Sequence, residues 1–239
     1  RRISTVVTVD LNSFREQLSA VRSMNENGPV HLVLAPTHRS FLDFILLSYL
    51  FFSVPELRVN LPFIVAADEF QFLPFIGWLA RQLRAFYIQR GKGRIDTNLS
   101  SRLRSLKMNH AGATFEVFIE GKRSRDRRFV DPKTGLLKSL VNSGGEHVIL
   151  PVTINYECIP EQKILSEEAA GSSRRGLTVT GMMLWLKDVF RGKVNIGKVH
   201  IAASGPLPVD CKTDKDFRQL VNDIQLNQQK QIVVSEYHI

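Results

Sequence analysis

A histidine and an aspartate, His38 and Asp43, stand five positions apart in the segment Thr-His-Arg-Ser-Phe-Leu-Asp. A histidine whose Nδ1–H is held by a carboxylate keeps Nε2 free to accept a proton, which is general-base chemistry. Five positions on an ideal helix turn through about 500°, so the two side chains would diverge if both were helical. They can meet if His38 precedes a helix and Asp43 lies in its first turns. On spacing alone, a capping histidine with a dipole-stabilised aspartate fits equally well.

A second polar segment, Phe-Ile-Glu-Gly-Lys-Arg-Ser-Arg, follows a predicted strand. Glycine permits close backbone approach, and arginine offers planar paired donors that match a phosphate. A solvated basic loop or an RNA contact would use similar residues. The candidate binding residues of this segment are Glu120, Gly121, Arg123, Ser124 and Arg125.

Two further strand ends carry candidate residues. The segment Ala-Phe-Tyr-Ile-Gln-Arg ends in Arg90, and Ile-Leu-Pro-Val-Thr places Pro151 inside an apolar strand. Ligands of parallel α/β sheets bind at the carboxyl ends of the strands. Convergence of these ends with His38 and Asp43 predicts one site rather than scattered surface residues.

The elements that must position these residues alternate between apolar strands and amphipathic helices. Strands are predicted at residues 30–35, 62–67, 85–88, 114–119, 147–156 and 198–203, and helices at 12–24, 40–54, 70–83, 96–108, 178–190 and 215–230. Residues 121–135 form a polar loop, and 161–175 are predicted to be a surface insertion. We therefore expect an α/β fold with a mostly parallel central sheet flanked by helices, in a single domain over 1–239. Because the first residue is Arg1, we expect the chain to be a fragment or a processed product.

The positive charge is concentrated in one part of the chain. The net charge is +9, and residues 81–128 hold thirteen Lys and Arg against four acids, which is also +9. Such a window indicates an acidic partner: phosphate, nucleic acid or an anionic membrane. A nucleic-acid-binding module would interleave exposed aromatic residues with the cations. The aromatic residues of this window lie mostly in predicted core strands, so no nucleic acid is expected.

The cysteine count and the apolar runs bear on the cellular compartment and on contact with a membrane. Two cysteines are too few for a disulfide framework, which favours a reduced compartment, and no signal-peptide pattern or metal-ligand spacing is present. The apolar run at 44–54 is shorter than the about 20 residues of a spanning helix and is predicted to be core. The aromatic stretch at 70–84 fits either the core or a bilayer surface.

The segments above, with Leu-Pro-Val-Thr-Ile as the last, resemble the four ordered blocks of the glycerolipid acyltransferases over about residues 32–157. Arg39 directly after the histidine, and Asp-Pro-Lys-Thr-Gly-Leu-Leu at 131–137, resemble the glycerol-3-phosphate and dihydroxyacetone-phosphate branch. The lysophosphatidate acyltransferases share these features less often. The resemblance implies a glycerol-3-phosphate acyltransferase-like fold.

The resemblance also implies residue roles. His38 and Asp43 match the family's HX4D catalytic pair, and the other candidates match acceptor-binding positions. Departures occur at Thr37, Gln89 and Lys122, where the family more often has Asn or Ser, Arg, and a small or hydroxyl residue. The hydroxyl of Thr37 is expected to cap the following helix. The expected substrate-binding residues are Arg39, Ser40, Arg90, Glu120, Gly121, Arg123, Ser124, Arg125 and Pro151.

The expected reaction is direct acyl transfer from acyl-CoA or acyl carrier protein to the primary hydroxyl of glycerol 3-phosphate, without a cofactor. Backbone N–H groups after Ser40 are candidates for an oxyanion site. Dihydroxyacetone phosphate is the alternative acceptor. A basic nucleic-acid-binding module and an inactive lipid-binding scaffold are readings of other classes. Peripheral contact with membrane lipid is expected, on the reduced side of a membrane.

Overall fold

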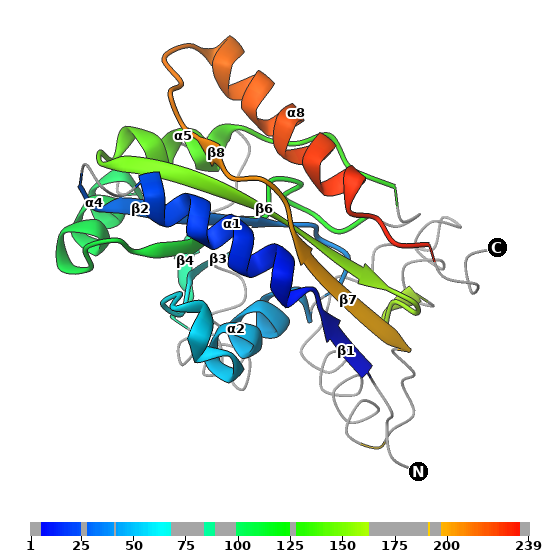
Figure 1. Cartoon of the computed structure of the whole chain (residues 1–239). Coiled ribbons are helices and arrows are strands. Elements are labelled where there is room, and N and C mark those ends of the chain that lie inside the picture. Colours follow the sequence, from blue (N-terminus) through cyan, green and yellow to red (C-terminus); the bar gives the residue numbers. More distant parts are fainter. Residues whose placement is uncertain are drawn as a thin grey trace.

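A mixed β-sheet with helices on both faces forms the centre of the molecule (Figure 1). The computed structural model describes residues 6–24, 28–40, 42–67, 84–88, 99–124, 128–162, 191 and 197–234. Its elements are β1 (Val6–Val9), α1 (Leu11–Met24), β2 (Val30–Pro36), α2 (Asp43–Ser53), the 3-10 helix η2 (Pro55–Leu57), β3 (Phe63–Ala67), β4 (Phe86–Ile88), α4 (Leu99–Asn109), β5 (Thr114–Glu116), α5 (Gly135–Asn142), β6 (Glu146–Tyr156), β7 (Lys198–Ala203), β8 (Leu207–Pro208) and α8 (Asp214–Lys230).

Most neighbouring strands of the sheet run parallel. The strand order is β1-β7-β6-β2-β5-β3-β4, with β8 paired to β6 outside that path. Strand β2 is parallel to both β5 and β6, and β3 is parallel to β4 and β5. Only the pairings of β6 with β7 and with β8 are antiparallel within the described residues. The predicted α/β fold with a mostly parallel sheet is confirmed, and the carboxyl ends of β2, β5 and β6 meet at one edge.

The two faces of the sheet pack against different helices. Leu32 and Leu34 of β2 belong to a core shared with α1 and α2, whereas Val33 and Ala35 belong to a core shared with α4, α5 and α8. All seven residues of β2 are buried, as expected of a strand covered on both faces. The continuous apolar run that predicted this strand therefore reflects burial on two sides.

Several predicted elements agree with the structure within one residue at each end. These are the helices at 12–24 and 215–230 and the strands at 30–35, 62–67, 85–88, 147–156 and 198–203. The predicted helices at 70–83 and 178–190 lie outside the described residues. No helix in the described ranges is both long and apolar enough to cross a bilayer.

Other boundaries were predicted wrongly. Helix α2 begins at Asp43 rather than near residue 40, because the backbone N–H groups of Arg39 and Ser40 donate to the Asp43 side chain instead of entering a helix. The strand predicted at 114–119 ends at Glu116, and the chain turns where Gly121 adopts a φ of 65°. Helix α5, a short helix whose Thr134 makes no side-chain cap, and the exposed strand β1 were not predicted.

A buried lysine joins α4 to the end of α5 at the amino-terminal end of β6. Lys107 Nζ shares its three N–H groups among four acceptors within hydrogen-bond distance: Leu140 O (2.5 Å), Ser143 Oγ (2.6 Å), Gly144 O (2.8 Å) and His147 Nε2 (2.7 Å). Because an ammonium group can only donate, Nε2 of His147 must accept and carry no proton. Burial, followed by the neighbouring Lys107 charge, lowers the pKa of His147 to about 3.

We expect this contact to make the protein less stable in mild acid. Below the ordinary histidine pKa of 6.5 the unfolded chain binds a proton at residue 147 that the folded chain excludes until about pH 3. The free energy of unfolding should fall by up to about 1.4 kcal/mol per pH unit across this window. Urea unfolding between about pH 7 and about pH 5 measures the slope. His147→Gln should flatten it and exposed His110→Gln should not; equal slopes in all three proteins would contradict the assignment.

Candidate active site

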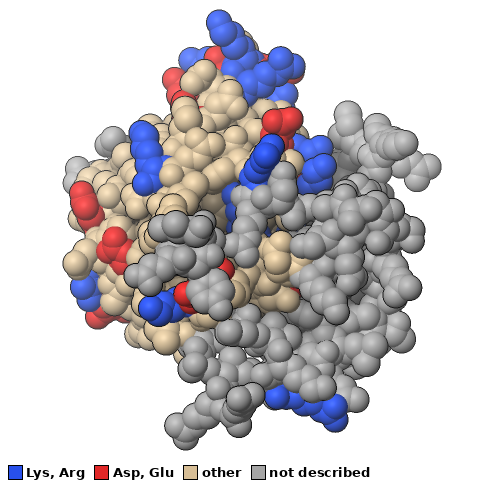
Figure 2. All heavy atoms as spheres, turned by 90° about the vertical axis from the view of Figure 1, so that its right-hand side faces the viewer, with Lys and Arg blue, Asp and Glu red and all other residues tan. Residues whose placement is uncertain are grey.

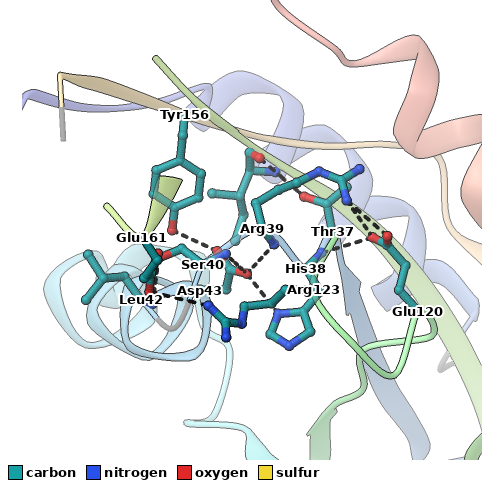
Figure 3. A network of polar contacts seen from close by, with 11 residues as sticks. Thr37, His38, Arg39, Ser40, Leu42, Asp43, Glu120, Arg123, Tyr156 and Glu161 are labelled. Atoms are coloured by element: carbon teal, nitrogen blue, oxygen red, sulfur yellow. Dashed lines mark hydrogen bonds and ion pairs between the residues drawn. The ribbon is translucent and has the colours of Figure 1, made fainter. Parts of the chain in front are cut away.

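Polar side chains meet where β2, β5 and β6 end and α2 begins (Figure 3). Residues 37–40 follow β2, Glu120 follows β5, and Tyr156 is the last residue of β6. Asp43 is the first residue of α2 and is fully buried. The strand-to-helix junction predicted for the histidine and the aspartate is therefore present.

Asp43 is the centre of this network. Its Oδ2 accepts hydrogen bonds from His38 Nδ1 (3.0 Å), Arg39 N (2.7 Å) and Ser40 N (2.9 Å), and its Oδ1 accepts one from the Tyr156 hydroxyl (2.7 Å). The first reading of the spacing holds, because the carboxylate binds the imidazole. The alternative of a capping histidine is not found, because Leu42 is the N-cap residue of α2 and no side chain caps it. Four donors thus converge on one buried carboxylate.

His38 is oriented from two sides. Its Nδ1 faces Asp43, and its ring lies 4.3 Å from the Phe118 ring, centroid to centroid, at 37°. The side chain is 18% exposed, and its Nε2 makes no hydrogen bond to any residue that the structure describes. An imidazole fixed through Nδ1 with an accessible Nε2 can remove a proton from a hydroxyl group.

An internal ion pair occupies the other side of the loop after β2. Arg39 Nη1 donates to both oxygens of Glu120 at 3.1 and 3.0 Å, and its guanidinium lies 4.5 Å from the Phe129 ring centroid. Glu120 also accepts from the backbone N–H groups of His38 and Val130, at 3.1 and 3.0 Å. The predicted substrate-binding residues Arg39 and Glu120 therefore hold one another and fix the backbone beneath the histidine.

Ser40 and Arg123 meet at a buried carboxylate. Ser40 Oγ lies 3.0 and 3.2 Å from the two oxygens of Glu161 and accepts from Leu42 N at 3.1 Å. Arg123 Nη1 lies 3.9 Å from Glu161 Oε1. The predicted surface insertion at 161–175 is therefore wrong at its first residue, because Glu161 is only 2% exposed.

Two described backbone N–H groups after Ser40 are taken up within the loop, and Phe41 lies outside the described residues. Leu42 N donates to the Ser40 hydroxyl, and Asp43 N donates to Ser40 O at 3.4 Å. These groups are thus not available for the predicted oxyanion site. Thr37 also differs from its predicted role as a helix cap: its hydroxyl donates to Ile154 O and accepts from Ile154 N, which ties the end of β2 to β6.

The remaining predicted residues either lie around this centre or fall outside the described residues. Gly121 occupies a turn beside the Lys133 side chain, and Ser124 is buried nearby in the same loop. Pro151 lies within β6, in register with Ala35 of β2. The predicted phosphate ligands Arg90 and Arg125 lie outside the described residues.

A further buried acid lies beneath the pair. Glu116 on β5 is in register with Leu34 of β2, is fully buried, and its two carboxylate oxygens have no hydrogen-bond partner among the described residues. Burial, followed by the charge of Asp43, raises the pKa of Glu116 well above its usual range. A neutral Glu116 leaves Asp43 without a second negative charge beside it.

Three residues of this centre were missed from the sequence: Glu116, Tyr156 and Glu161. Tyr156 could have been found, because it ends a buried strand predicted to run parallel to the strand before His38. Glu116 and Glu161 carried no signal, since an acid in an apolar run and the first acid of a polar stretch are both common in solvated positions.

The surface near the carboxyl-terminal helix is electrostatically mixed. Figure 2 shows Lys and Arg side chains lying beside Asp and Glu side chains on the described part of one face. Among the described residues, no three His, Cys, Asp or Glu side chains gather as metal ligands would. In the polar network around His38, the carboxylates of Asp43, Glu120 and Glu161 accept hydrogen bonds from arginine, serine and backbone donors.

Comparison with known proteins gives the family. The model of the Acyltransferase family matches residues 20–155, more than half of the chain. The fold resembles that of the 1-acyl-sn-glycerophosphate (LPA) acyltransferase PlsC from Thermotoga maritima, with a TM-score of 0.55 and 19% identity over 98% of this chain and 76% of that one. The matched residues include His38, Asp43, Glu120 and Arg123. This chain belongs to the Acyltransferase family.

Proposed function

We propose that this protein transfers a fatty acyl group from acyl-CoA, or from acyl carrier protein, to the primary hydroxyl of glycerol 3-phosphate. The observation that carries the proposal is the His38 ring held by buried Asp43 at 3.0 Å, with Nε2 directed away from that contact. This arrangement provides the general base that acyl transfer to an alcohol requires. The membership of the Acyltransferase family supports the reaction class.

The acyl group is transferred directly from the thioester to the acceptor oxygen. Nε2 of His38 takes the hydroxyl proton as the acceptor oxygen attacks the thioester carbonyl. The carbon–sulfur bond then breaks, the thiolate leaves, and the imidazolium returns the proton to it. Asp43 compensates the positive charge that His38 carries between these events. No side-chain nucleophile is needed, so no acyl-enzyme is expected.

The acceptor phosphate is proposed to lie near Arg123. Its guanidinium lies near Glu161, which is hydrogen-bonded to Ser40 in the loop after β2. A guanidinium can pair with two phosphate oxygens in one plane. Arg90 and Arg125 are proposed as further ligands from the sequence. Holding the phosphate would place the primary hydroxyl near His38 and lower the entropy cost of the encounter.

The acceptor can be assigned by competition. We expect acyl-CoA turnover to be fastest with glycerol 3-phosphate when glycerol 3-phosphate, dihydroxyacetone phosphate and lysophosphatidate compete at equal concentration, with products separated chromatographically. The resemblance of Arg39 and residues 131–137 to the glycerol-3-phosphate branch supports this order. If acyl-dihydroxyacetone phosphate is the main product, the alternative acceptor is supported. If phosphatidate is the main product, neither glycerol 3-phosphate nor dihydroxyacetone phosphate is the preferred acceptor. Salt-sensitive oligonucleotide binding without acyl transfer would favour a nucleic-acid-binding module instead.

Peripheral membrane contact is proposed through α2. Tyr49 and Phe52 on this helix are 62% and 74% exposed, and the same helix begins with Asp43 of the proposed catalytic pair. Exposed aromatic side chains and a net charge of +9 suit an anionic lipid surface. We expect Phe52→Ser to reduce co-flotation with anionic vesicles, and Met108→Ser, a change at a 79% exposed residue of α4, to leave it unchanged. Equal flotation of the two variants would contradict a role for α2.

A further inference from the structure

Tyr156 touches the proposed catalytic pair from a strand outside its segment. It is the last residue of β6, is only 5% exposed, and donates its hydroxyl proton to Asp43 Oδ1 at 2.7 Å. Its ring belongs to the core shared with α1 and α2. Figure 3 shows the hydroxyl directed at Asp43 from the side away from the imidazole.

The two oxygens of Asp43 have separate partners. Oδ2 carries the bond to His38 Nδ1 and two backbone bonds, whereas in the described residues Oδ1 has the Tyr156 hydroxyl. Loss of that hydroxyl would leave a fully buried carboxylate oxygen without its donor. Such an oxygen is strongly driven to find another partner, and rotation of the carboxylate is the simplest route. The bond to His38 would then lengthen or bend.

The backbone around Tyr156 is braced against the same loop. The Thr37 hydroxyl exchanges hydrogen bonds with both backbone groups of Ile154, two residues before Tyr156. Thr37 N also donates to Val152 O at 3.0 Å. The end of β6 is thus tied to the residue that directly precedes His38, so the tyrosine and the histidine keep a fixed separation.

We propose that Tyr156 is a positioning residue: its hydroxyl holds Oδ1 of Asp43 so that Oδ2 stays aligned with Nδ1 of His38. The proposal deepens the proposed function and rests on it for its kinetic consequence. Tyr156 lies beneath Asp43 and is not expected to touch either substrate. It should therefore affect kcat more than KM.

Other charged groups near the pair set the background for any pH effect. Among the described residues they come from the loop after β2, from β5 and the loop after it, and from the turn after β6: Arg39, Glu116, Glu120, Arg123 and Glu161. A phenylalanine at position 156 changes none of them. A shift caused by that substitution can therefore be assigned to the lost hydroxyl.

The test is Tyr156→Phe, which keeps the ring in the core and removes the hydroxyl. We expect kcat to fall about tenfold, the usual effect of losing a hydrogen bond to a charged group, with KM within about twofold. The acid limb of the kcat/KM profile should move to lower pH, because a longer or bent bond to Asp43 stabilises protonated His38 less. Ser23→Ala, which removes an exposed hydroxyl from α1, is the control and should behave as wild type.

A second measurement does not depend on acyl transfer. NMR titration of the His38 ring, in wild type and Tyr156→Phe without substrate, should show the same downward shift. If wild type transfers acyl groups to none of the three acceptors, the proposed function fails while this titration still tests the tyrosine. An unmoved His38 titration in a folded Tyr156→Phe variant would overturn the positioning role, whatever the activity; so would unchanged kcat.

Discussion

Replacement of His38 by alanine is expected to lower kcat/KM for acyl transfer by about 10² to 10⁴-fold, the usual contribution of a general base. Without Nε2, no other described side chain at the carboxyl end of β2 is placed to take the hydroxyl proton. Asp43 cannot replace it, because the carboxylate is buried and all its described contacts are with donors of the protein. The acceptor would then have to react as a neutral alcohol.

The loss should be catalytic rather than structural. His38 is partly exposed, and its backbone N–H bond to Glu120 does not need the imidazole. Steady-state turnover with glycerol 3-phosphate measures the effect, and urea unfolding shows whether the fold is retained. His110→Ala removes an exposed histidine directly after α4 and should retain wild-type turnover. Wild-type turnover in His38→Ala would sink the proposed mechanism.

The meeting of His38 and Asp43 was predictable from local geometry. Five positions on a helix separate two side chains in angle, so contact required a junction, and the apolar runs on either side supplied a strand and a helix. The approach of Glu120 was predictable by the same route, since parallel strands bring their carboxyl ends to one edge. The predicted contact with Asp43 is present at 3.0 Å, and Glu120 lies at the predicted edge, where it accepts from His38 N at 3.1 Å.

The partners of the arginines were not predictable in the same way. Arg123 was predicted to bind phosphate because guanidinium groups suit phosphate, and Arg39 was predicted to bind the acceptor, but the same chemistry suits a carboxylate. In the structure they lie against Glu120 and Glu161, which are 81 and 38 positions away along the chain. Such pairings depend on which loops the fold brings together, and a single sequence contains no local signal for them.

Replacement of Glu120 by glutamine is expected to lower the free energy of unfolding by about 3–5 kcal/mol. The substitution leaves the guanidinium of Arg39, whose side chain is 10% exposed, as a buried charge without its ionic partner. It also weakens the acceptor for the N–H groups of His38 and Val130. Urea unfolding measures the loss. Glu56→Gln breaks the exposed pair with Arg15 and should cost no more than about 1 kcal/mol.

The double variant Glu120→Gln with Arg39→Met separates a structural role from a binding role. Removing both charges should recover much of the lost stability, because an apolar side chain tolerates the buried position that an unpaired cation does not. If the pair only holds the loop, kcat and KM should recover with stability. If Arg39 or Glu120 binds the acceptor, as the sequence predicted, the refolded double variant should keep a raised KM. An equal loss of stability in the double variant and in Glu120→Gln would show that the unpaired charge is not the cause.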